Sequence, residues 1–197
     1  MILIEDAFRD EEVLIPRDVL SAAGGRVVLA ASRQGECRGM LGATVTPDMT
    51  LPDVCVEDFD AILIPGGEGT PVLRSHPIVQ ELVQAFARES KLVCALCWAP
   101  TILAVAGLLE GRRAVSCHID ETSDFPNMKS HQVLLSHGAI LADAHVVRDG
   151  NIITGDGPQY AHEFAQTVLE ALMGLNTGRW SSQQSPAGDR RKAPPDE

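Results

Sequence analysis

The sequence predicts a single α/β domain with a mainly parallel sheet and helices on both of its faces. Short apolar runs alternate with longer segments in which apolar residues recur three or four positions apart. Several of the short runs contain almost no polar residue, as expected of strands that are covered on both sides. Glycines and prolines fall near the ends of the helical segments. This alternation of strand and helix is typical of the α/β class.

Six apolar runs are expected as strands: Met1–Ile4, Arg26–Ala31, Asp60–Ile64, Leu92–Cys97, Ala114–Cys117 and Asn151–Thr154. Four segments have helical periodicity: Glu11–Ala23, Pro71–Arg88, Pro100–Leu109 and Pro158–Met173. Two hairpin-like stretches predict antiparallel additions. They are Cys37–Thr50 and Ile140–Val147, the latter paired with Asn151–Thr154 through the turn at Asp149 and Gly150.

The chain divides once by composition. Residues 1–174 are expected to form one domain, which is long enough to bury a core without disulfides. Residues 175–197 are rich in Ser, Gln, Pro, Gly and charge, without a repeating apolar face, and are expected to form a disordered tail.

Composition also excludes several classes of function. A net charge of −11 argues against a general nucleic-acid binder, and the apolar runs are too short to cross a membrane. The start of the chain does not resemble a secretory leader. The chain has five cysteines, and an odd number suits a reducing compartment. The expected location is therefore the cytoplasm. The six histidines lack zinc-like spacing, and no metal site is expected.

Two strand ends carry residues suited to chemistry. The glycine-rich stretch Ile64–Pro71 lacks the spacing of a dinucleotide fingerprint and the lysine of a Walker loop, so it is either a plain turn or part of an anion hole. Cys97 stands where an apolar strand turns into a helix, at a corner that exposes a thiol and favours its thiolate. The alternative is that Cys97 is a buried residue that only fills space in the core. That interpretation is preferred for Cys94, which lies in the middle of the predicted strand. A redox-active Cys-x-x-Cys pair of Cys94 and Cys97 is therefore not expected.

Partners for Cys97 are expected at neighbouring strand ends. Glu12 lies in an acidic stretch after the first strand, and His118 follows the predicted strand Ala114–Cys117. Each also has a plainer interpretation, Glu12 as an acidic helix start and His118 as a surface or structural histidine.

Taken together, these residues resemble the DJ/ThiJ/PfpI family, part of the class I glutamine amidotransferase-like superfamily. The resemblance covers residues 1–174 and rests on motifs in a fixed order along the chain. The motifs are the acidic stretch with Glu12, Leu63–Gly67, Ala95–Thr101, Ser116–His118, Asp149–Thr154, and Gly157-Pro158 leading to Phe164-Ala165. A true amidotransferase needs His and Glu two positions apart late in the chain, whereas His162 and Glu163 are adjacent.

The resemblance implies a flavodoxin-like three-layer sandwich with Cys97 as the nucleophile. It implies that Glu12, in its protonated form, hydrogen-bonds the sulfur, and that His118 is a nearby base. The backbone N–H groups of Gly67 and Trp98 would form an oxyanion hole, with Gly66 shaping the turn. The protease-like branch places a histidine directly after the cysteine, and here that position holds Trp98, which favours small substrates over peptides.

The leading hypothesis is an enzyme that acts on small reactive carbonyls such as methylglyoxal, of the glyoxalase III or deglycase kind, without a cofactor. One alternative is a redox sensor or chaperone of the oxidative-stress response that uses oxidation of Cys97. Another is a small-substrate C–N hydrolase or a PfpI-type peptidase. The resemblance also implies a homodimer, or a hexamer as in some branches.

Overall fold

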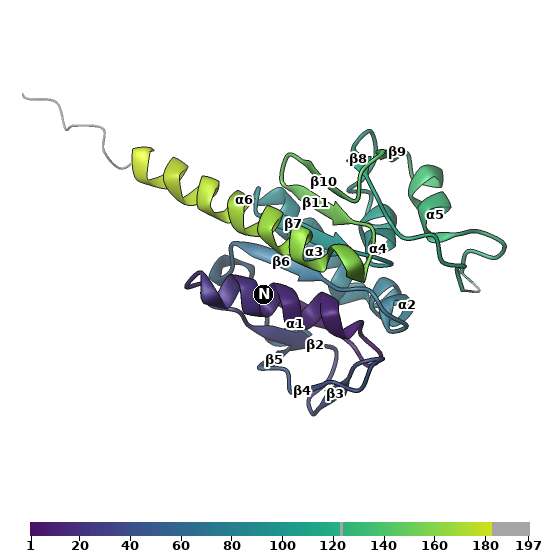
Figure 1. Cartoon of the computed structure of the whole chain (residues 1–197), viewed down its shortest axis with the longest axis horizontal. Helices are drawn as coiled ribbons and strands as arrows, with labels where there is room; N and C mark the ends of the chain where they lie inside the picture. Colours follow the sequence, from purple (N-terminus) through teal and green to yellow (C-terminus); the bar gives the residue numbers. More distant parts are fainter. Residues whose placement is uncertain (123, 183–197) are drawn as a thin grey trace, which may run out of the picture.

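The computed structural model describes residues 1–122 and 124–182, and its centre is a seven-stranded sheet (Figure 1). The order of the strands across the sheet is β10-β11-β7-β6-β1-β2-β5. All neighbouring pairs are parallel except β10 and β11. The strands are β1 (Ile2–Ile4), β2 (Leu29–Ala31), β5 (Met49–Thr50), β6 (Ala61–Ile64), β7 (Leu92–Leu96), β10 (Val146–Asp149) and β11 (Ile152–Gly155). The predicted mainly parallel α/β sheet is confirmed.

Helices cover both faces of the sheet and form the outer layers. In Figure 1, α1 and α6 lie against each other on one face, with α3 and α4 on the other. The α-helices are α1 (Asp10–Ala22), α2 (Thr70–Ser75), α3 (Pro77–Arg88), α4 (Pro100–Val105), α5 (Ser130–Ser136) and α6 (Ala161–Ser182). Short 3₁₀ turns occupy Leu51–Asp53, Val56–Asp58 and Pro158–Tyr160.

The strand residues separate into two apolar clusters because successive side chains point to opposite faces. Leu3 and Val93 pack in the cluster that contains α3 and α4 residues, whereas Ile4 and Cys94 pack in the cluster that contains α1 and α6 residues. All five residues of β7 are buried. The uninterrupted apolar sequence of this strand is therefore a consequence of helices on both sides.

The structure corrects several predicted elements. The run Ala114–Cys117 is not in the main sheet: β8 (Arg113–Ala114) pairs with β9 (Ile140–Leu141) in a separate small sheet, and the chain after Ala114 is irregular. The segment Pro71–Arg88 is two helices, because Pro77 lacks the N–H that would continue the first.

Further differences concern the connections. Only β3 (Cys37–Arg38) and β4 (Thr44–Val45) form the expected antiparallel hairpin, and Met49–Thr50 instead extends the main sheet in parallel with β2. Helix α5 was not expected. The antiparallel pairing through Gly150 agrees with the prediction, but only Val146 and Val147 of the predicted strand Ile140–Val147 take part in it, because Ile140–Leu141 forms β9 and pairs with β8.

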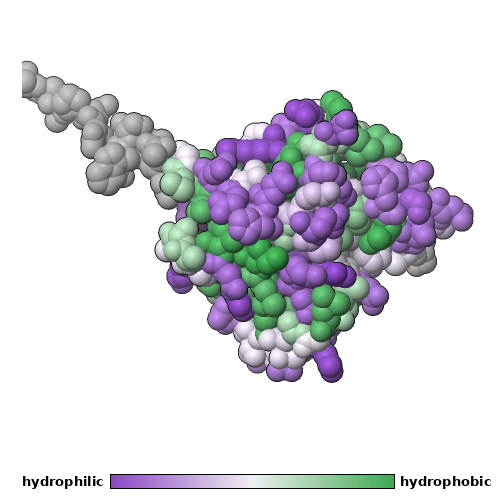
Figure 2. Space-filling view, viewed as in Figure 1, coloured by the Kyte–Doolittle hydropathy of each residue, from purple (hydrophilic) through white to green (hydrophobic). Residues whose placement is uncertain are grey.

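Helix α6 continues to Ser182, so it passes the domain end expected at residue 174; the rest of the expected tail, residues 183–197, lies outside the described residues. None of the helices in the described part of the chain is long and apolar enough to cross a membrane. Figure 2 shows a hydrophobic strip over α1 and α6, whereas the surface around α5 is largely hydrophilic.

Candidate active site

A cavity of about 520 Å³ opens at the carboxyl ends of the central strands. Strands β7, β6 and β1 are neighbours in the sheet, so the segments that follow them meet at one edge. The lining of the cavity includes Arg9, Gly67, Cys97, Trp98, Cys117 and His118. A second cavity of about 330 Å³ lies beside Met1 and Leu172, and neither a cysteine nor a histidine lines it.

Cys97 occupies a sharp corner between β7 and α4. Its φ angle is +62°, in the left-handed region that residues with a side chain rarely adopt, at a cost of about 1–3 kcal/mol. The backbone is held there by a hydrogen bond from the Cys97 N–H to the carbonyl of Gly155, at 2.8 Å. The corner places the sulfur, which is partly exposed, at the cavity wall. Such strained corners are found where a nucleophile has to be presented.

The acidic residues at the start of α1 have three separate roles. Asp10 is structural: its carboxylate accepts the backbone N–H groups of Leu41 and Ala43, each at 2.8 Å. Glu11 lies at the surface and forms an ion pair with Arg9. Glu12 is the acid that turns inward.

Glu12 is 2% exposed, and its Oε2 accepts the backbone N–H of Gly66 at 2.7 Å. Its second oxygen, Oε1, is buried and has no hydrogen-bond partner among the described residues. Burial raises the pKa of Glu12 to about 8, against the smaller lowering effects of the Gly66 N–H and the Cys97 thiol. The carboxyl is therefore mostly protonated at neutral pH and has an O–H to donate toward the sulfur.

Gly66 and Gly67 allow the backbone to pass directly beneath Cys97. A methyl group on Gly66 would lie 2.8 Å from the Cys97 Cβ and 2.9 Å from the Trp98 nitrogen. Gly67 has a φ of +110°, and a side chain there would collide with the Ala7 carbonyl. In the described part of the chain, neither the Gly67 N–H nor the Trp98 N–H donates a hydrogen bond. These two donors remain available at the edge of the cavity.

Cys117 is a functional candidate that the sequence analysis did not single out. It lines the same cavity as Cys97, and the two thiols are close enough to affect each other's pKa. Its sulfur also lies 3.4 Å from the Ser130 hydroxyl. We call Cys97 and Cys117 the cysteine pair. The only sequence signal for Cys117 was its place beside His118 in one of the family motifs.

The two thiols of the cysteine pair titrate together. Interaction with the Cys97 thiol lowers the pKa of Cys117 to about 7, with help from Ser130 and the Ile119 backbone. The same interaction raises the pKa of Cys97, and burial and Glu12 add to the rise. The first proton is therefore lost by the pair as a unit, and the two sulfurs share the remaining proton.

His118 lies at the rim of the cavity, where it is exposed. Its ring contacts that of His131 in a tilted arrangement, with 4.1 Å between the centroids. No hydrogen bond joins His118 to Cys97 among the described residues. The structure brings His118 to the cavity but not into contact with the sulfur.

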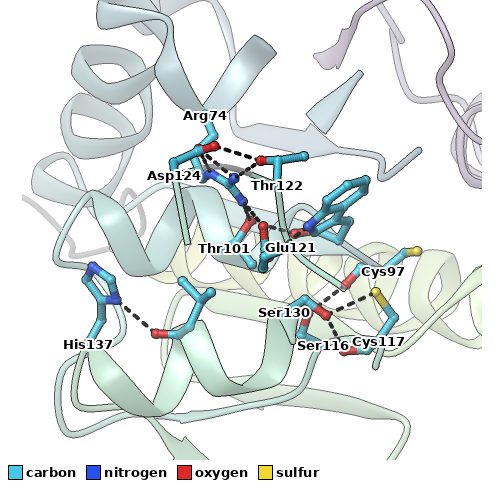
Figure 3. Close-up of polar contacts among 12 residues, drawn as sticks. Arg74, Cys97, Thr101, Ser116, Cys117, Glu121, Thr122, Asp124, Ser130 and His137 are labelled. Carbon is cyan, nitrogen blue, oxygen red and sulfur yellow. Dashed lines mark hydrogen bonds and ion pairs between the residues drawn. The ribbon is translucent and has the colours of Figure 1, made fainter. Parts of the chain in front are cut away.

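A buried ion network holds the Trp98 wall of the cavity (Figure 3). The indole N–H of Trp98 donates to Glu121 at 2.8 Å, and the other oxygen of Glu121 accepts from Arg74, also at 2.8 Å. The side chains of Arg74 and Glu121 are 2% and 0% exposed. Arg74 also binds Asp124 and Thr101. The network ties the segment after His118 to α2 and α4 and fixes the indole in place.

Metal ligands are not gathered at the site: within residues 1–122 and 124–182, no group of three or more His, Cys, Asp or Glu side chains is placed to hold an ion.

The DJ-1/PfpI family model matches residues 1–171. The chain belongs to this family. It is 34% identical over 170 residues to the glutathione-independent glyoxalase DJR-1.2 of Caenorhabditis elegans, which covers 86% of this chain and 85% of that protein. It is 32% identical over 172 residues to a deglycase of Pyrococcus abyssi, and the match covers 87% of this chain and 98% of that protein. The crystal structure of Drosophila melanogaster DJ-1beta superposes with a TM-score of 0.75 at 30% identity, and the match covers 87% of this chain and 88% of that chain. The flavodoxin-like fold expected from the sequence is thus confirmed.

Proposed function

We propose that this DJ-1/PfpI protein converts small 2-oxoaldehydes such as methylglyoxal into 2-hydroxy acids, with Cys97 as the nucleophile and no added cofactor. The observation that carries the proposal is the pairing of a cysteine on a strained corner with a buried, protonated Glu12 beside an open cavity. The relatives named glyoxalase and deglycase support the same class of substrate.

In the first step, the sulfur of Cys97 adds to the aldehyde carbon. Once the cysteine pair has lost its first proton, the remaining proton stays on Cys117 as the new C–S bond forms at Cys97. The aldehyde oxygen becomes an alkoxide. The free N–H groups of Gly67 and Trp98 stabilise its charge, and Glu12 provides the proton that completes the hemithioacetal.

In the second step, a proton leaves the former aldehyde carbon and another is added to the neighbouring ketone carbon, through an enediolate, while the hydroxyl proton of the hemithioacetal passes to the former ketone oxygen. The Glu12 carboxylate, just deprotonated and interacting with Cys97, is the proposed base, and His118 at the rim exchanges protons with solvent. The product is a thioester of Cys97 with the 2-hydroxy acid. Water hydrolyses this thioester, which releases the acid and restores the thiol. The sum is one oxoaldehyde and one water giving one hydroxy acid.

The Trp98 wall favours substrates of this size. The indole is 8% exposed and is fixed by Glu121, so the residue after the nucleophile narrows the cavity instead of offering a second catalytic group.

The test is lactate formation from methylglyoxal by purified protein. Cys97→Ser is expected to reduce the rate to that of buffer alone. Cys55→Ser is the matched control, because Cys55 is an exposed thiol bonded only to Glu57 in the described structure, and it should retain the wild-type rate. A panel of small esters and amides is assayed in parallel. Equal lactate production by wild type and Cys97→Ser, or faster turnover of amides than of aldehydes, would refute the proposal.

A further inference from the structure

The cysteine pair stands out from the other three cysteines. Cys37 and Cys94 are fully buried, and Cys55 is exposed and hydrogen-bonded to Glu57. Cys97 and Cys117 are both partly exposed, line one cavity and are joined by a backbone hydrogen bond. The proposed carbonyl chemistry uses one of these sulfurs as nucleophile and leaves the redox capacity of the pair unused.

The backbone already holds the two residues at the separation a disulfide requires. The Cys117 N–H donates to the Cys97 carbonyl at 3.0 Å, and the Ser116 hydroxyl donates to the same carbonyl at 2.8 Å. A direct N–H···O=C bond between two residues places their α-carbons about 5–6 Å apart, inside the usual range for a disulfide.

The segment that carries Cys117 is held by individual hydrogen bonds and not by a strand of the main sheet. Val115–Ile119 is irregular chain after β8, and the Val115 N–H donates to the Thr154 hydroxyl. Cys97 stands at the end of the central strand β7, where its N–H bonds to Gly155. We therefore expect any movement that accompanies formation of an S–S bond to fall mainly on the Cys117 side.

We propose that Cys97 and Cys117 form a reversible intramolecular disulfide when the protein meets a hydroperoxide, and that this disulfide protects Cys97 from irreversible oxidation while it suspends the carbonyl chemistry. The inference concerns the same cavity as the proposed function but does not require that function to be correct.

The chemistry balances in two steps. The Cys117 thiolate attacks one oxygen of the hydroperoxide, the O–O bond breaks, the sulfur keeps that oxygen as a sulfenic acid, and the other oxygen leaves as water or an alcohol after taking a proton. The Cys97 sulfur then attacks the sulfenic sulfur, the S–S bond forms, and the hydroxyl leaves as water with the Cys97 proton. The pair loses two electrons and the peroxide gains them. Two equivalents of a monothiol such as glutathione, or one equivalent of dithiothreitol, return both cysteines to thiols.

Ser130 fits this sequence of steps. Its hydroxyl lies 3.4 Å from the Cys117 sulfur and also donates to the Cys117 carbonyl. It is fully buried at the start of α5, so it holds the Cys117 residue at both backbone and side chain. Ser130 therefore helps to hold Cys117 in place beside Cys97.

The experiment is peptide mapping without reductant after treatment with two equivalents of hydrogen peroxide at neutral pH, enough for either a disulfide or a sulfinic acid. Wild type is expected to yield a cross-linked peptide that contains Cys97 and Cys117 and disappears with dithiothreitol. Cys55→Ser should give the same peptide. Cys117→Ser should give none, and its Cys97 should instead gain two oxygens, a change that dithiothreitol does not reverse.

Two results would overturn the inference: Cys97 of wild type gains oxygens as fast as in Cys117→Ser without a cross-linked peptide, or the cross-link joins a different pair of cysteines. The map of the wild type decides the matter even if Cys117→Ser folds poorly. Because the readout is mass, it is separate from turnover. A cross-link without lactate formation would refute the proposed function alone, and lactate formation without a cross-link would refute this inference alone.

Discussion

Replacement of Glu12 by glutamine tests whether the active-site carboxyl is protonated. The pKa of Glu12 is about 8 in the folded protein, against 4.5 for an ordinary glutamate. Between these values the unfolded chain releases a proton that the folded protein retains, so stability is greatest below about pH 4.5 and is lost as the pH rises toward 8. The slope reaches about 1.4 kcal/mol per pH unit, and the loss between about pH 5 and 8 is on the order of 3 kcal/mol.

Glutamine has no proton to release in this range, and its carbonyl oxygen still accepts the Gly66 N–H. Urea unfolding of both proteins at several pH values should therefore show that Glu12→Gln gains stability relative to wild type, by about 3 kcal/mol, as the pH rises from about 5 to 8. Glu11→Gln is the matched control. Its partner Arg9 lowers the pKa of Glu11, so its titration falls below this range and its curve should run parallel to that of wild type. Parallel curves for Glu12→Gln and wild type would show that the carboxyl is ionised in the folded protein.

The remaining predictions concern activity and the walls of the cavity. Activity on methylglyoxal should rise as the cysteine pair loses its first proton near pH 7 and fall as Glu12 ionises near pH 8, so kcat/KM plotted against pH should be a narrow bell. Gly66→Ala should reduce kcat at least tenfold and stability by about 1–3 kcal/mol, because its methyl group would lie 2.8 Å from the Cys97 Cβ; kinetics and urea unfolding measure both. Arg74→Met should cost about 3–5 kcal/mol in urea unfolding, because it leaves Glu121 charged and buried, and a second change, Glu121→Gln, should restore part of that loss.

Each of these predictions has an opposite outcome. Activity that keeps rising beyond pH 9 would mean that no protonated acid is needed. Wild-type kinetics for Gly66→Ala would mean that the loop moves away from Cys97 at little cost. Equal stability of the Arg74→Met single variant and the double variant with Glu121→Gln would mean that the Glu121 charge is satisfied by groups other than Arg74.

The central layer of the fold was predictable because its strands are buried on both faces. Leu92–Leu96 has no polar residue, and the pattern breaks only at the corner where Cys97 stands. Ala114–Cys117 was misplaced because a short apolar run has the same pattern whether it joins the main sheet or a small one. Helix α5 was missed because its flanking residues are polar and its seven residues are too few to show a clear periodicity.

The site was predictable only where local sequence defines the geometry. A corner after an apolar strand locates Cys97, and adjacent glycines locate the turn beneath it. The partnership of Cys97 with Cys117 depends on how the chain folds back after α4 and β8, because Cys117 lies 20 residues further along the sequence. Nor did local sequence indicate that Asp10 would cap a loop while Glu12 turns toward the sulfur, because both side chains belong to one acidic cluster. Burial decides between them, and burial is a property of the packed molecule.

The attachment of Trp98 to the buried ion network limits how the cavity can be reshaped. A smaller residue at position 98 would widen the cavity but leave one oxygen of Glu121 without a donor in a dry environment. A neutral residue at position 121 would in turn remove a partner from Arg74. Enlargement of the cavity for bulkier substrates therefore requires linked substitutions at positions 74, 98 and 121, and a library that varies Trp98 alone should contain mostly unstable proteins.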